Sequence, residues 1–159
     1  FIDTRFNTPG QPAPVRGIEQ GGYRLVWKDE PNAFDKARMT DAKSLSLTHS
    51  LGITIDKDAK VTATQWDGPA FNAGVVTGSK ILAVNGTGYD ADALKRAITA
   101  AKDGAPLDLL FQRGDKFQTV KLDYRGGLRW PWLERAAPGT APTGLDRLLA
   151  PKRPQSGRK

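Results

Sequence analysis

Proline is distributed so unevenly along this chain of 159 residues that it divides the chain into parts. Only Pro69 and Pro106 of the 11 prolines fall among residues 45–124, and the other nine fall in the remaining 79 residues. Proline interrupts helices and the interior strands of sheets, so a stretch almost free of it can form continuous secondary structure. Residues 45–124 are therefore predicted to form one compact domain with an extension on each side.

The two extensions have different compositions. Residues 1–22 are rich in Pro and Gly and are interpreted as a linker. Residues 23–44 are predicted to form a strand and a short helix that join the domain to a preceding part. The domain itself is assigned to residues 45–125, and residues 126–159 are interpreted as a basic Pro- and Gly-rich tail.

Most of the net charge of +7 comes from the tail. Residues 45–124 carry nine Lys or Arg and nine Asp or Glu, whereas residues 125–159 carry eight and two. A nucleic-acid-binding domain is expected to carry its basic stripe on the folded body, so a solvated or loosely docked tail is the favoured interpretation. Nucleic-acid binding through the tail is ranked last and predicts strongly salt-dependent association. No apolar run approaches the length of about 18 residues that a membrane-spanning helix needs.

The periodicity of the compact block alternates between strands and helices. Asn32 is a candidate cap for a helix over residues 33–39, and Asp90 for a longer one over residues 91–102. Strands are predicted at residues 23–27, 50–55, 61–66, 80–84, 107–112 and 117–124, and a short helical turn at residues 69–73. This order predicts an α+β fold, a small antiparallel barrel or sandwich of five to six strands capped by two helices.

Catalytic and metal-binding signatures are scarce. His49 is the only histidine and there is no cysteine, which excludes an H-E-x-x-H zinc site and a thiolate nucleophile within this chain. None of the serines lies in a G-x-S-x-G turn that would support a triad with His49. Residues 56–60 begin like a calcium loop, but Lys60 stands where an oxygen ligand is required. No catalytic or metal-binding residue and no cofactor is assigned to this chain.

The most informative local pattern is the glycine bend Ser50-Leu51-Gly52-Ile53 that enters a strand. Such a bend can point backbone N–H groups toward a carboxylate, and a free strand edge beside it can accept a peptide as an added strand. The helix over residues 91–102 is predicted to form the second wall of the groove. The candidate peptide-binding residues are His49, Ser50, Leu51, Gly52, Ile53, Thr54, Ile55, Ala91, Lys95 and Ile98.

Residues 67–86, DGPAFNAGVVTGSKILAVNG, resemble the signature of PDZ domains, S/G-P-A-x-x-A-G-h-x-x-G-D-x-I-h-x-V-N-G. The resemblance covers about residues 46–124, and Ser79 stands where the family usually has Asp. The order of elements is similar to that of the circularly arranged PDZ domains of bacterial proteases. It implies a peptide-binding groove between the strand at residues 53–55 and the helix over residues 91–102.

The flanking segments at residues 22–32 and 122–131, together with residues 50–53, resemble the C-terminal part of the bacterial glycyl aminopeptidases. In that family a PDZ domain follows a thermolysin-like catalytic domain that binds zinc. The resemblance implies that this chain is a fragment of such a metallopeptidase, a hydrolase, which explains the missing initial Met. It also implies zinc only in the parent's catalytic part and a periplasmic or secreted location.

Two main hypotheses follow. In the first, the chain is a peptide-binding module for a peptide or protein segment. In the second, the groove is filled within the parent enzyme, by the tail or by residues 1–22, and the domain braces or orients the parent's catalytic domain. Peptide specificity and oligomeric state are not predicted.

Overall fold

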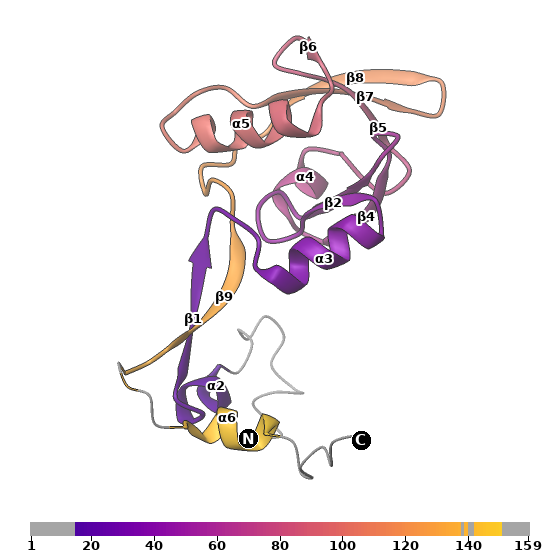
Figure 1. Cartoon of the computed structure of the whole chain (residues 1–159). Helices are drawn as coiled ribbons and strands as arrows, with labels where there is room; N and C mark the ends of the chain where they lie inside the picture. The colour runs from indigo at the N-terminus through magenta and orange to yellow at the C-terminus, as the bar shows by residue number, and fades with distance from the viewer. Residues whose placement is uncertain (1–14, 138, 140–141, 151–159) are drawn as a thin grey trace, which may run out of the picture. The chain divides into compact units, whose positions relative to one another are not determined.

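The computed structural model describes residues 15–137, 139 and 142–150 (Figure 1). The chain divides into two compact units, one formed by Trp27–Trp132 and the other by the segments on either side. The candidate groove lies within the first unit. The described residues include no helix long and apolar enough to cross a membrane.

The first sheet of the Trp27–Trp132 unit has three antiparallel strands in the order β2-β3-β4. They are β2 (Ser44–Leu47), β3 (Ile53–Asp56) and β4 (Val61–Thr64). Leu45 pairs with Ile55 and Leu47 with Ile53 in the β2–β3 register. The register of β3 with β4 shifts between Thr54 and Ile55. The central strand of this sheet is therefore β3.

The second sheet has four antiparallel strands in the order β6-β5-β7-β8. Its strands are β5 (Lys80–Val84), β6 (Thr87–Gly88), β7 (Asp108–Arg113) and β8 (Lys116–Lys121). Asn85 begins the turn between β5 and β6 with a φ of 48°. Its side chain accepts a hydrogen bond from the Asp108 backbone N–H at 2.8 Å and donates one to the Pro106 carbonyl at 3.0 Å. The predicted turn thus also links β5 to the start of β7.

Two helices accompany these sheets, α4 (Pro69–Asn72) and α5 (Ala91–Ala101) (Figure 1). Pro69 occupies the first turn of α4, where a missing N–H costs nothing. The carboxylate of Asp90 accepts a bond from the Ala93 N–H and caps α5 as predicted. The buried face of α5 consists of Leu94, Ala97, Ile98 and Ala101. Lys102 follows as the C-cap instead of continuing the helix.

One apolar core joins both sheets to these helices. Phe111, Ile81 and Leu109 contribute from the four-stranded sheet, and Ile53 and Ile55 from the three-stranded one; all are at most 1% exposed. The predicted α+β class with antiparallel sheets and two helices is confirmed, and the sheets are open, without closing into a barrel. Residues 44–121 hold seven strands because β2 and β6, which are only four and two residues long, join the predicted set.

The predicted elements before residue 45 also form. α3 (Ala33–Asp41) begins at its predicted cap, where the Asn32 side chain accepts a bond from the Asp35 N–H at 2.9 Å. The strand β1 (Tyr23–Lys28) pairs with β9 (Trp130–Arg135). Much of the predicted linker lies outside the described residues, but α2 (Arg16–Gln20) forms within it.

Part of the predicted basic tail is regular. Besides β9 it contains α6 (Gly144–Leu149), whose start is a capping box between Thr143 and Asp146. Asp146 also accepts a hydrogen bond from the Tyr23 hydroxyl at 2.8 Å and pairs with Arg135 at 2.7 Å. These bonds, led by the one from the Thr143 backbone N–H, lower the pKa of Asp146 from 3.8 to about 2.

Candidate functional site

The glycine bend before β3 is held in place by the loop that precedes α4. Gly52 has a φ of +78°, and a Cβ placed there would lie 3.3 Å from the Gln65 Cβ and 3.4 Å from the Gly68 Cα. The Gln65 N–H donates to the Gly52 carbonyl at 2.7 Å, and the Ala70 N–H donates to the Leu51 carbonyl at 3.0 Å. A residue with a side chain at position 52 would meet both the strained φ and the close neighbours, which accounts for glycine here.

The donors of this bend are used by the chain itself. The backbone N–H groups of Ser50 and Gly52 both donate to the Leu47 carbonyl, each at 3.0 Å. Leu47 is the last residue of β2. Amides near residues 51–53 were predicted to bind a carboxylate or a carbonyl of a ligand. In the structure the Gly52 N–H donates instead to the carbonyl of Leu47 at the end of β2.

The predicted peptide-accepting edge of β3 is not free. β2 pairs with β3 on one side, and β4 pairs with it on the other. The prediction that residues 53–55 form a free edge is therefore wrong for this structure. A strand was predicted at residues 50–55 but none at residues 44–47, so no partner was predicted for that edge.

The β2 strand fits the expected place of a peptide in several respects. It runs antiparallel to β3, it ends at the glycine bend, and its Leu47 side chain is only 1% exposed. Leu47 belongs to the same buried cluster as Leu94 and Ile98 of α5. Ile98 was predicted to face a ligand, but it is fully buried. A four-residue segment of the chain, Ser-Leu-Ser-Leu, thus pairs with the edge of β3 that was predicted to accept a peptide.

The remaining predicted residues divide into buried and exposed groups. Leu51, Ile53 and Ile55 are core residues, and Ser50 is 4% exposed. The Ser50 hydroxyl accepts a bond from the Arg129 N–H at 3.0 Å, and Thr54 is half-buried beside Ser46 in the β2–β3 register. His49 is exposed, and its ring lies 5.2 Å from the ring of Trp27. His49 thus lies beside Trp27 at the bend.

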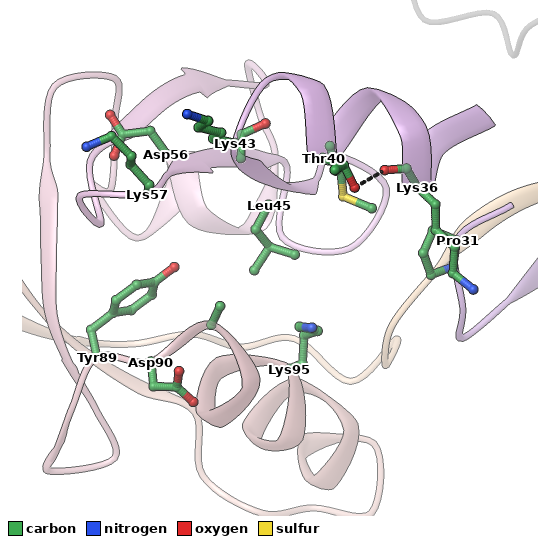
Figure 2. A pocket seen from close by; sticks show the side chains of 13 residues that line it. Pro31, Lys36, Thr40, Lys43, Leu45, Asp56, Lys57, Tyr89, Asp90 and Lys95 are labelled. Carbon is green, nitrogen blue, oxygen red and sulfur yellow. Dashed lines mark hydrogen bonds between the residues drawn. The ribbon is translucent and has the colours of Figure 1, made fainter. Parts of the chain in front are cut away.

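An open cleft of about 770 Å³ lies beside the filled groove, between α3, the β2–β3 pair and the start of α5 (Figure 2). Ala91 and Lys95, both predicted as ligand-facing, line it. Leu45 points into the space from β2, toward Tyr89 and Lys95 (Figure 2). Burial, followed by the charges of Asp90 and Asp56, raises the pKa of Tyr89 above its ordinary value.

Sequence reasoning missed the residues that α3 and β2 bring to this cleft, namely Lys36, Met39, Lys43 and Leu45. The alternation Ser-Leu-Ser-Leu at residues 44–47 was the one available signal, because alternating apolar residues are typical of a half-buried strand. Within the described part of the chain, no group of three or more His, Cys, Asp or Glu side chains could hold a metal ion.

Comparison with known proteins concerns the fold alone. No protein-family model matches the sequence, and no curated protein matches it significantly. An aminopeptidase N family protein from Idiomarina loihiensis matches 95% of this chain, with a TM-score of 0.54 and 15% identity. The chain spans 25% of that protein's length. The HtrA3 PDZ domain, solved with the phage-derived ligand FGRWV, matches 70% of this chain and 93% of its own, with a TM-score of 0.34 and 17% identity.

The chain has an α+β fold with open antiparallel sheets. From β2 to β8 the elements follow the order strand, glycine bend, two strands, short helix, two strands, long helix and final hairpin. Ser79, the one departure from the PDZ signature, is fully buried, and its hydroxyl accepts a bond from the Val76 N–H at 3.4 Å. The departure therefore lies in a turn and leaves the groove unchanged.

Proposed function

We propose that this chain is the PDZ-like, non-catalytic module of an aminopeptidase and serves there as a structural domain whose peptide groove is filled by its own β2 strand. The observation that supports the proposal is the position of β2, which pairs with β3 and ends with the Leu47 carbonyl on the Ser50 and Gly52 amides. The segment that fills the groove is residues 44–47, instead of the tail or the linker.

A covalently attached strand is a strong competitor for any free peptide. A short connection gives such a segment an effective concentration in the millimolar range. A free peptide that makes the same contacts as β2 must therefore reach millimolar concentrations before it displaces half of β2. A peptide without an equivalent apolar side chain would in addition leave the site of the buried Leu47 side chain unfilled, at a cost of about 2–5 kcal/mol.

The parent is proposed to be a bacterial, zinc-dependent glycyl aminopeptidase in the periplasm or the medium. The resemblance of residues 22–32 and 122–131 supports this proposal, and the fold shared with part of an aminopeptidase N family protein is consistent with it. Zinc is proposed for the parent's catalytic part, as the resemblance of the flanking segments implies. An H-E-x-x-H motif upstream of this chain in the coding sequence, with one zinc per full-length protein, is the expected result. Absence of the motif would contradict the proposal that the parent is a zinc-dependent aminopeptidase.

A disulfide lock tests whether β2 fills the groove. Ser46 and Thr54 face each other in the β2–β3 register, and the natural chain has no cysteine, so Ser46→Cys with Thr54→Cys creates a single reversible lock. A library of C-terminal peptides is titrated into oxidised and reduced protein while amide NMR shifts at the bend are followed. The matched control lock is Leu110→Cys with Thr119→Cys, a facing pair in the other sheet.

The structural role predicts no bend shifts in the oxidised lock and no binding tighter than about 1 mM in the reduced protein. Micromolar binding that occurs only after reduction would contradict the structural role and would indicate that peptides bind by displacing β2. Micromolar binding at the bend with the lock closed would show that β2 does not occupy the binding groove.

A further inference from the structure

The open cleft beside β2 has an apolar floor with no part of the described chain laid across it. Leu45 from β2, Met39 from α3 and Tyr89 before α5 contribute apolar surface to it (Figure 2). Leu45 is only partly buried, whereas Leu47, two residues later on the same face of β2, is fully buried. The face that β2 presents to the core therefore continues into an open, accessible space.

Four lysines and two aspartates line this cleft. Both aspartates are engaged with backbone N–H groups: Asp56 accepts from Asp58 and Lys60, each at 2.9 Å, and Asp90 caps α5. Two of the lysines have acidic partners on their own elements, Lys57 with Asp58 at 3.1 Å and Lys95 with Asp92 at 2.6 Å.

The other two lysines, Lys36 and Lys43, are exposed and form no ion pair with any described residue. They flank the part of the cleft where α3 meets β2. Two unpaired ammonium groups beside an apolar floor match a ligand that carries both an apolar side chain and carboxylates.

We infer that this cleft binds an extended acidic segment of a partner protein, with an apolar side chain on Leu45 and Tyr89 and carboxylates on Lys36 and Lys43. The site is separate from the groove that β2 fills, so it needs no displacement of β2. It adds a partner-binding role to a module whose peptide groove is already occupied.

The probe is a six-residue peptide of alternating Glu and Leu with acetylated and amidated ends, titrated into the full chain while amide NMR shifts are followed. A Lys and Leu peptide of the same length and a Gln and Leu peptide are the ligand controls. Saturable shifts are expected at Lys43, Leu45 and Ala91 with the acidic peptide only. They should persist in the oxidised Ser46→Cys and Thr54→Cys lock, which separates this inference from the proposed function.

Substitutions of single lysines test which of them bind the carboxylates of the peptide. Lys36→Ala and Lys43→Ala should each weaken the affinity about two- to fivefold, the range for exposed ion pairs, and Lys43→Glu should weaken it further. Lys121→Glu is the matched control, because Lys121 is an exposed lysine at the end of β8, outside the cleft. It makes the same change in net charge and should leave the affinity unchanged.

Three results would overturn the inference. They are the absence of shifts up to millimolar acidic peptide, equal binding of the acidic and basic peptides, and an equal loss in Lys43→Glu and Lys121→Glu. If a single-stranded oligonucleotide instead gave saturable shifts at the same residues, while the acidic peptide gave none, the lysines would be assigned to nucleic-acid binding.

Discussion

Truncation of Leu47 to alanine tests how strongly β2 is held in the groove. The side chain is 1% exposed and belongs to the core that includes α5. Leu47→Ala removes three carbons, worth about 2.4 kcal/mol at about 0.8 kcal/mol each, and the remaining cavity adds about 1 kcal/mol. The expected loss in the free energy of unfolding is therefore about 3.5 kcal/mol.

The assay is urea unfolding followed by circular dichroism. A loss of this size lowers the midpoint by about 2 M at a slope of about 1.5 kcal/mol/M. Leu45→Ala is the matched control, because it is the same substitution on the same face of the same strand at a half-buried position. It should cost about 1 kcal/mol. A loss below about 1 kcal/mol for Leu47→Ala, or an equal loss for both variants, would refute the view that Leu47 anchors β2 in the core.

Three further predictions concern the bend, a turn and a cap. Gly52→Ala should destabilise the domain by about 1–2 kcal/mol in urea unfolding, because φ is positive at this position and Gln65 lies close to the added methyl group. Gly88→Ala is the control, and because the space around Gly88 is open it should cost about half of that or less. Asn85→Ala should cost about 2 kcal/mol in the same assay, since it loses the bonds to Asp108 and Pro106, and a change below about 0.5 kcal/mol would contradict that role. The lowered pKa of Asp146 should stabilise its unit above about pH 4, and this contribution should disappear as the pH falls toward about 2. A carboxyl titration by NMR with a midpoint near 4 would contradict it, and Asp146→Asn should remove the pH dependence.

The local elements could be predicted because their causes are local. Asp90 caps α5 and the apolar residues of that helix recur at helical spacing, so its start and its buried face follow from the sequence. The Asn85 turn is equally local, and residues 107–112 and 117–124 alternate as the paired strands β7 and β8 do. In each case the residues that decide the structure are close together in the chain.

The state of the groove could not be predicted in the same way. The glycine bend was recognised from four residues, but whether its amides face a ligand depends on Leu47, which the strand pairing brings to them. Ile98 has the spacing of a groove residue, yet it is buried in the cluster that contains Leu47. The lysines Lys36 and Lys43 are far from Lys95 in sequence. They line the same cleft only because α3, β2 and α5 pack near one another.

By itself, the sequence determined the α+β class, the positions of α3, α4, α5 and most strands, and the lack of a histidine- or cysteine-based metal site in this chain. Only the tertiary structure decided that β2 pairs with the edge of β3 and that an open, lysine-lined cleft lies beside it. The physical reason is that hydrogen-bond donors and strand edges are generic along a backbone, so the sequence shows where they occur. Which of them remain free is set by the distant segments that pack against them.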